Sequence, residues 1–474
     1  MNDTTDTTTD TEYRTFDDYV AEIPRYDSFY SVGEHRDRDE TLANSYEHVD
    51  FEVHGTSSDD NEIWSLTIGD GRYTAFFFAA PHPNEPIGCM TIDFLAQTLA
   101  KDTQLRDSLD YEFVFMKFAD IDGSLLNQGW FDGPFTLSNY AQNFYRPASY
   151  EQVEWTFPMD YKDYTFDESL PETEILMEII ETHQPDFIYS LHNAGFGGCY
   201  YYISEECSEI FDDLRQISRD QDVPLDLGEP EAPWMEEFDD AIYQMPSSEM
   251  NYDYLEENTD DSPAEVLTTG AGSYDYAREH NAEVVELVTE LPYFYDEQIE
   301  SDTKTDRTRR EIVLEGIEKE AALVNFLEDQ YDRIADDLPD TRFKRAIADI
   351  IDNFHDRIEA KRNWAKTDDE LDENATVAQT VDALTIRLFY RMLYLGTFMR
   401  AIDQRTMQAS ESVDVDQLID AKQQIEDRFH ELNGMLLENL DYEAIPIWKL
   451  VAIQSQAGLI CLDYLQKSDY FEDE

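Results

Sequence analysis

Basic residues are scarce in this chain of 474 residues. Lysine and arginine together number 34, against 106 aspartate and glutamate residues, so the formal net charge is −72. Binding to nucleic acid needs a basic stripe or patch, and the sequence contains none. A charge this negative is also typical of disordered chains, but 41% of the residues are hydrophobic and 13% are aromatic. The chain is therefore predicted to fold around a full core and not to bind nucleic acid.

Cysteines and long apolar runs are also few. Four cysteines without a C-x-x-C pair are too few for a disulfide framework. The first residues, 1–6, lack the charged-then-apolar pattern of a secretory signal. The best candidate for a membrane span, 388–399, contains Arg391 and is followed by Arg400. We therefore expect a cytoplasmic protein that makes no membrane contacts.

Strand and helix patterns alternate through the first two thirds of the chain. This alternation predicts an α/β domain over 16–302, with a mixed twisted sheet flanked by helices. Residues 1–15 are rich in Thr and Asp and are expected to form a disordered tail. The segments 127–158 and 222–262 are expected to be irregular. Apolar or alternating runs predict strands at 48–54, 62–68, 73–80, 111–118, 186–191, 199–203 and 284–291.

After residue 303 the strand pattern almost disappears. Apolar residues such as Ile312, Ile317, Val324 and Leu327 recur at helical spacing, and further amphipathic segments follow. Residues 303–474 are therefore predicted to form an all-α C-terminal bundle. Its sequence carries no recognisable chemistry, and three roles stay open for it: contacts with a partner, cover over a site, and contacts in a homo-oligomer.

Polar side chains stand at the carboxyl ends of three predicted strands. His82 and Glu85 follow one strand, His192 follows another, and Glu290 lies near the end of a third. Open α/β sheets bind their ligands at this edge. Two histidines and one glutamate can hold Zn²⁺ and leave a position open for water. Because a charged residue in an apolar strand is costly without a partner, Glu290 is the preferred candidate for the general base of a hydrolysis.

With these motifs the chain resembles the zinc metallocarboxypeptidases of the carboxypeptidase A type. The resemblance implies a mixed, twisted sheet flanked by helices, zinc bound by His82, Glu85 and His192, and Glu290 as the base that activates water. It also implies that Asn143 and Arg146 bind the terminal carboxylate of a substrate, and that Tyr274 acts in side-chain specificity. The segments that carry it are His82-Pro83-Asn84-Glu85, Asp122-Gly123, Asn143-Phe144-Tyr145-Arg146, Leu191-His192-Asn193, Gly272-Ser273-Tyr274-Asp275-Tyr276 and Thr289-Glu290-Leu291-Pro292.

The sequence departs from this family at two points. The family has adjacent Asn and Arg residues, whereas Phe144 and Tyr145 separate Asn143 from Arg146 here. The family also has an Arg that polarises the scissile carbonyl, and none stands near the matching residues 130–132. The group that stabilises the oxyanion is therefore left open.

Three functions follow from these residues. The first is a zinc-dependent carboxypeptidase that removes a C-terminal residue from peptides. The segment His82-Pro83-Asn84-Glu85 is also similar to a motif of the succinylglutamate desuccinylase and aspartoacylase group. The second function is therefore a zinc-dependent deacylase of N-acyl amino acids. The third is a non-catalytic binding protein on the same scaffold.

The acidic charge predicts adaptation to concentrated salt. Self-repulsion of this size destabilises a compact state unless dissolved ions screen it. On dialysis from molar to low salt, the protein should lose its secondary structure, as followed by circular dichroism. Retained structure at low salt would contradict this prediction.

Overall fold

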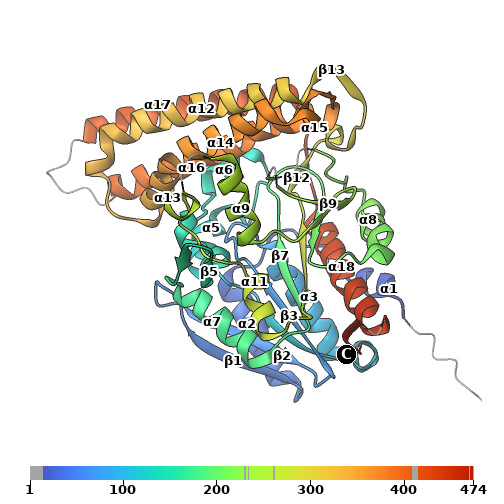
Figure 1. Ribbon diagram of the computed structural model, residues 1–474. Coiled ribbons are helices and arrows are strands. Elements are labelled where there is room, and N and C mark those ends of the chain that lie inside the picture. Colours follow the sequence, from blue (N-terminus) through green and yellow to red (C-terminus); the bar gives the residue numbers. More distant parts are fainter. Residues whose placement is uncertain are drawn as a thin grey trace, which may run out of the picture.

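The computed structural model describes residues 14–228, 231–232, 234–259, 262–407, 415–468 and 470–472. The tail predicted at 1–15 lies, up to residue 13, outside the described residues. Figure 1 shows a twisted sheet with helices packed around it in the lower part of the molecule, and a layer of long C-terminal helices above. The predicted fold class, a mixed α/β sheet flanked by helices and followed by a helical C-terminal region, is confirmed.

The central sheet is mixed and, within the described residues, has nine strands in the order β1-β2-β4-β3-β7-β11-β8-β10-β9. In its centre β3 is parallel to β4 and β7, and β7 is parallel to β11, whereas β1, β2 and β8 pair antiparallel with their neighbours β2, β4 and β11. The bounds are β1 Val49–Thr56, β2 Glu62–Ile68, β3 Tyr73–Ala79, β4 Tyr111–Met116, β7 Phe187–His192, β8 Tyr200–Ile203, β9 Glu237–Asp239, β10 Ile242–Gln244 and β11 Val285–Glu290.

The central strands are largely apolar because helices cover both faces of the sheet. Phe76, Phe77 and Phe78 in β3 are almost completely buried. The ring of Phe77 makes edge contacts with Phe115 and Tyr189 on the two neighbouring strands. The helices of this part are α1 Phe16–Val20, α2 Val32–Ser45, α3 Ile87–Lys101, α4 Thr103–Leu109, α5 Ile121–Asn127, α6 Leu137–Asn143, α7 Pro171–His183, α8 Phe211–Asp220, α9 Ser248–Asn258, α10 Pro263–Val266 and α11 Ser273–His280.

The prediction that 222–262 is irregular is wrong in part. This segment contains β9, β10 and α9, and β10 extends the sheet by pairing parallel with β8. Each of the two strands is only three residues long, which is too short for an alternating pattern to be recognised. The segment 127–158 is closer to the prediction, since α6 and short 3-10 turns are its regular elements among the described residues.

The C-terminal region is helical, as predicted. Within the described residues, no helix has both the length and the apolar character needed to cross a bilayer. Two-stranded pairings tie the region together and to the sheet layer: β13 Lys304–Thr308 with β14 Asn374–Thr376, and β12 Phe294–Tyr295 with β15 Glu443–Ala444. Its helices are α12 Arg309–Ile334, α13 Arg342–Asp352, α14 Phe354–Thr367, α15 Val377–Val381, α16 Arg387–Met407, α17 Val415–Asn439 and α18 Ile447–Lys467.

The last helix, α18, packs against the central sheet. Gln454 is completely buried there, accepts a hydrogen bond from Thr91 on α3 at 2.9 Å and donates one to the backbone carbonyl of His192 at 2.9 Å. Gly458 lies against the ring of Tyr189 on β7. By these contacts α18 belongs to the layer that covers the sheet. The domain boundary expected between residues 302 and 303 stays a prediction.

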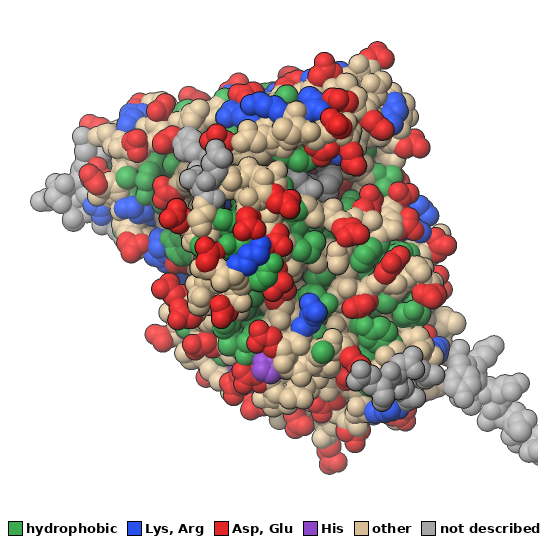
Figure 2. Space-filling model, viewed as in Figure 1, with side chains coloured by type: hydrophobic (Ala, Val, Ile, Leu, Met, Phe, Trp, Pro, Cys, Tyr) green, Lys and Arg blue, Asp and Glu red, His purple; other side chains and the backbone are tan. Residues whose placement is uncertain are grey.

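The surface is acidic on the face shown in Figure 2. Carboxylate side chains are spread over both the sheet layer and the upper helices, and basic side chains are scattered among them. No single region of this face concentrates the charge. On this face the excess of acid is therefore spread over the exposed surface, which is consistent with the predicted salt dependence.

Gly396 sets how closely α16 approaches α6. A Cβ atom at this position would lie 1.9 Å from the carbonyl oxygen of Ala141, which is backbone and cannot simply rotate away. We expect Gly396→Ala to lower the free energy of unfolding by about 1–3 kcal/mol, because the two helices would have to separate. Urea unfolding in molar salt measures this quantity.

Gly434 on α17 provides the matched control. A Cβ atom there would meet nothing within 4 Å, so Gly434→Ala should raise the free energy of unfolding by roughly 0.5–1 kcal/mol through helix propensity. Equal effects of the two substitutions would contradict a close packing contact at Gly396.

Candidate metal centre

The turn after β3 places His82 and Glu85 on the same side of the chain. Ala80 has a φ of 49°, and the backbone N–H of Glu85 donates to the carbonyl of His82 at 3.1 Å. The next residue, Pro86, caps α3, so both side chains lie between the carboxyl end of a strand and the start of a helix. This placement is the one predicted from the sequence.

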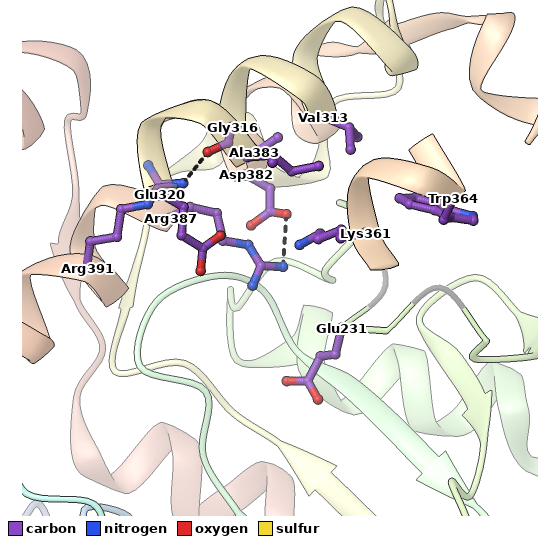
Figure 3. A pocket seen from close by; sticks show the side chains of 11 residues that line it. Glu231, Val313, Gly316, Glu320, Lys361, Trp364, Asp382, Ala383, Arg387 and Arg391 are labelled. Atoms are coloured by element: carbon purple, nitrogen blue, oxygen red, sulfur yellow. Dashed lines mark hydrogen bonds and ion pairs between the residues drawn. The ribbon is translucent and has the colours of Figure 1, made fainter. Parts of the chain in front are cut away.

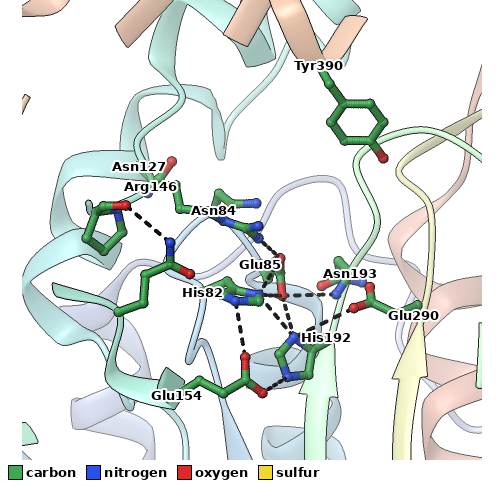
Figure 4. A network of polar contacts seen from close by, with 12 residues as sticks. His82, Asn84, Glu85, Asn127, Arg146, Glu154, His192, Asn193, Glu290 and Tyr390 are labelled. Atoms are coloured by element: carbon green, nitrogen blue, oxygen red, sulfur yellow. Dashed lines mark hydrogen bonds and ion pairs between the residues drawn. The ribbon is translucent and has the colours of Figure 1, made fainter. Parts of the chain in front are cut away.

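Three side chains converge above the ends of β3 and β7 (Figure 4). Nδ1 of His82 lies 3.1 Å from Nδ1 of His192 and 3.1 Å from Oε1 of Glu85, and Nδ1 of His192 lies 3.1 Å from Oε2 of Glu85. Ligands at about 2.0–2.1 Å from a tetrahedral zinc ion are roughly 3.3 Å apart. The spacing and the chemistry of these donors therefore fit one zinc ion, and His82, Glu85 and His192 form a candidate metal site.

Glu154 holds both imidazoles from the opposite side. Its two carboxylate oxygens lie 3.1 Å from Nε2 of His82 and 2.9 Å from Nε2 of His192, and the hydroxyl of Ser190 lies 2.7 Å from the latter nitrogen. A carboxylate in this position keeps the proton on Nε2, fixes the plane of each ring and leaves Nδ1 available for a metal.

Glu154 is a site residue that was not predicted from the sequence. The residue lies on a short 3-10 turn, Val153–Trp155, inside the segment expected to be irregular. No motif marks it, and the remaining signal is a carboxylate flanked by two large apolar residues. A similar pattern, a carboxylate among apolar residues, singled out Glu290, but Glu290 also lies at the end of a predicted strand. Glu154 is buried as well, but no predicted strand end marks its position.

The charges of this cluster keep its carboxylates ionised. Burial raises the pKa of Glu85 and of Glu154, but His82, together with Arg146 for Glu85 and with His192 for Glu154, holds both values well below the usual range. Burial alone would lower the pKa of His192, and Glu154 and Glu85 outweigh it and raise that pKa well above its usual value. Two ionised carboxylates beside two imidazoles can compensate the charge of a divalent cation.

Glu290 reaches the same place from β11. It is the register partner of His192 across the parallel β7–β11 pair, and its Oε1 lies 3.8 Å from Nδ1 of His192. Burial raises the pKa of Glu290 well above its usual value, although His192 and Arg146 oppose the shift. A buried carboxyl group with a raised pKa beside a metal site is a candidate for general acid–base work.

Arg146 approaches the cluster from the side of Glu85. Its Nη2 donates to Oε1 of Glu85, and its Nε donates to the side-chain oxygen of Asn84 at 3.2 Å. About a third of the Arg146 side chain, 35%, is exposed. Arg146 therefore reaches the candidate metal site from a partly exposed position.

Two predicted substrate-binding residues lie apart from this cluster. Asn143 ends α6, and its amide donates to the backbone and side-chain oxygens of Asn139 at 2.9 and 3.2 Å. Tyr274 lies on α11 and packs against an aromatic cluster that includes Tyr200 and Tyr202. The five other predicted site residues are brought together, whereas these two make no hydrogen bond or ion pair with them within the described residues. Their roles stay predictions.

The loop after His192 is fixed by hydrogen bonds. The backbone N–H of Asn193 donates to Oε2 of Glu85 at 3.2 Å, and its side-chain amide donates to the carbonyl of Leu291 at 3.2 Å. The hydroxyl of Tyr293 donates to the Asn193 side chain at 3.1 Å. Asn193 thus joins the ends of β7 and β11 and orients a candidate ligand carboxylate.

Comparisons with known proteins find similarity among solved structures. No family model matches the sequence, and no curated protein matches it. The chain is similar to carboxypeptidase A from Helicoverpa armigera (TM-score 0.38, 16% identity, 56% of this chain and 65% of that chain). It is also similar to a metallo-carboxypeptidase from Burkholderia cenocepacia (TM-score 0.33, 14% identity, 56% and 60%) and to one from Pseudomonas aeruginosa (TM-score 0.32, 13% identity, 72% and 70%). The matched region spans less than two thirds of the length of the first two proteins. At identities this low, function has to be read from the side chains of the site.

Because the Glu154 carboxylate contacts both imidazoles, Glu154→Gln should weaken the binding of zinc. An amide can accept a hydrogen bond from only one of the two rings and would present its N–H groups to the other, so zinc affinity should fall by about 10–100-fold. Competition with a chromophoric chelator measures this affinity. Glu151→Gln, three residues earlier and paired with Arg345 at 2.7 Å, should leave it unchanged. Wild-type affinity in Glu154→Gln would contradict the assigned role.

Proposed function

We propose that the chain is a zinc-dependent carboxypeptidase that hydrolyses the C-terminal peptide bond of its substrates. The observation that carries this proposal is the convergence of His82, Glu85 and His192 at 3.1 Å spacing, with Glu290 beside them. Three donors of this type suit zinc and leave coordination positions open. A buried carboxyl group next to the open side suits hydrolysis better than a purely structural zinc site, in which four protein ligands close the metal.

Each residue of the site has a role in this reaction. Zn²⁺ held by His82, Glu85 and His192 would supply Lewis acidity and bring the pKa of a water molecule towards about 7. Glu290 takes a proton from the water molecule while the oxygen of that water forms a bond to the scissile carbonyl carbon. The same carboxyl group then delivers that proton to the leaving amine as the C–N bond breaks. Burial raises the pKa of Glu290, and a raised pKa makes the carboxylate a stronger proton acceptor in the first of these steps.

Arg146 is assigned to the carboxylate of the substrate. Its planar guanidinium offers a fork of N–H groups that matches a carboxylate, and the partial exposure of its side chain supports this assignment. In this structure two of its nitrogens bind Asn84 and Glu85. Engagement of a substrate would therefore compete with these contacts. Asn143 is proposed as a second partner of the carboxylate and Tyr274 as part of the specificity wall.

The proposed base can be tested with Glu290→Gln. Glutamine keeps the size of the side chain but cannot take up a proton, so turnover of blocked dipeptides should fall by roughly a hundred- to ten-thousand-fold. Zinc content should stay the same, since Glu290 is not among the proposed ligands. Near-normal turnover in this variant would remove Glu290 from the mechanism, and absence of zinc from the wild-type protein would remove the proposal itself.

Glu286→Gln on the same strand is the matched control. Glu286 is buried four residues before Glu290, accepts a hydrogen bond from Ser273 at 2.9 Å, and has a pKa raised by burial to about 8. The group is therefore mostly neutral at pH 7, and replacing it with an amide should change turnover little.

A panel of N-acyl amino acids, assayed beside the dipeptides, separates peptidase from deacylase activity. No feature of the site favours the deacylase.

A further inference from the structure

A small cavity lies among the C-terminal helices, and charged side chains point into it (Figure 3). Its volume is about 50 Å³, which is enough for a few water molecules or one small anion. Residues of α12, of α14 and of the start of α16 line it, together with Glu231, Asp382 and Ala383. Basic side chains enter it from two helices: Lys361 from α14, and Arg387 and Arg391 from α16.

Arg391 is buried without enough partners. Only 4% of the surface of this residue is exposed. Nη2 donates to the backbone carbonyl of Gly316 at 2.8 Å, but Nε and Nη1 have no hydrogen-bond partner among the described residues. Buried donors are almost always paired with protein or with something bound. Two unpaired N–H groups of a guanidinium are the usual means of holding a carboxylate or phosphate.

Lys361 faces the same cavity and is also unpaired. No hydrogen bond or ion pair joins its ammonium group to another described residue. Burial lowers its pKa, and the neighbouring charges of Arg387 and Arg391 lower it further, against the opposing effect of Glu320 and Asp382. Lys361 and Arg391 repel each other across this small cavity, and a negative charge between them would stabilise both.

Three carboxylates line the cavity beside the three basic groups: Glu231, Glu320 and Asp382. Asp382 forms an ion pair with Arg387 at 3.6 Å, although its Oδ2 has no hydrogen-bond partner among the described residues. Glu320 makes no ion pair with Arg391, Lys361 or Arg387. In a chain with 106 acidic and 34 basic residues, two buried basic groups that no carboxylate reaches are unexpected. Arg391 and Lys361 therefore indicate a position for another anion.

The backbone next to the cavity has an unusual form. Asp382–Ile386 makes a π-helical turn immediately before α16, and such turns occur frequently at functional sites. Gly316 packs against it, and a Cβ atom there would lie 2.9 Å from the carbonyl of Ala383. This close contact holds the Gly316 carbonyl where Arg391 binds it and so directs the rest of the guanidinium.

We infer that this cavity binds a small anion that carries a carboxylate or phosphate group, through Arg391, Lys361 and Arg387. The site is distinct from the candidate metal centre but lies close to it in the fold. Glu231, on the wall of the cavity, accepts hydrogen bonds from Tyr200 and Tyr202 at 2.7 and 3.1 Å, and Tyr200 is the register partner of Glu290. An anion in the cavity would therefore contact elements that also support the catalytic edge.

The test is equilibrium dialysis of the full-length, chelator-treated protein against radiolabelled inorganic phosphate in potassium chloride of constant ionic strength. Removal of metal ensures that phosphate does not bind to zinc. A parallel titration with succinate, as a competitor for the label, distinguishes a phosphate site from a general carboxylate site. We expect saturable binding of one anion per chain, and absence of saturable binding of either probe would overturn the inference.

Two substitutions locate the binding. Arg391→Met and Lys361→Met should each weaken it by at least about tenfold, because each removes charged donors. Arg362→Met is the control, since Arg362 lies next to Lys361 on α14 but points outward to Glu318 at 3.0 Å. Circular dichroism confirms that each variant is folded. Binding that is unchanged in both Arg391→Met and Lys361→Met would place the anion elsewhere and overturn the inference.

Discussion

The candidate metal centre depends on the parallel pairing of β3, β7 and β11. Ala79 pairs with Leu191, and His192 pairs with Glu290, so three strands end at one edge and their last side chains meet. A shift of one residue in either pair would turn a side chain to the other face of the sheet. The buried aromatic residues of these strands therefore do more than fill the core: they fix the register on which the 3.1 Å spacing of the ligands depends.

This edge concentrates negative charge where water is largely excluded. Glu85, Glu154 and Glu290 lie around two imidazoles, and the guanidinium of Arg146 contacts Glu85. Buried carboxylates are stable only when positive charge and hydrogen bonds compensate for lost hydration. A divalent cation between the Nδ1 atoms would add compensation at the point where all three proposed ligands meet. The same charge distribution explains why Glu290, which is further from the cations, has a raised pKa while Glu85 and Glu154 have lowered ones.

The sequence predicts the parts of the site that lie on long, regular elements. His82, His192 and Glu290 each follow or end a strand whose apolar run is visible in the sequence, and the chemistry of strand ends then brings them together. Glu154 could not be predicted in this way, because it comes from an irregular segment and meets the histidines only through the tertiary fold. The strands β9 and β10 were missed for a related reason, since three residues show no period. The packing of α18 on the sheet was also beyond prediction, because an apolar helix face does not specify its partner.

The C-terminal helices take part in positioning the site. Gln454 on α18 holds the carbonyl of His192, and the hydroxyl of Tyr390 on α16 binds both the N–H and the carbonyl of Phe196, in the loop that follows His192. Arg400, also on α16, donates to the carbonyls of Asn143 and Phe144 just before Arg146. The backbone on both sides of the proposed metal ligands and carboxylate clamp is thus tied to these helices. Support of the site is a further role, which these contacts indicate, and the three roles expected from the sequence stay predictions. The cavity among the helices is linked to the same edge of the sheet through Glu231, which accepts hydrogen bonds from Tyr200 and Tyr202 on β8.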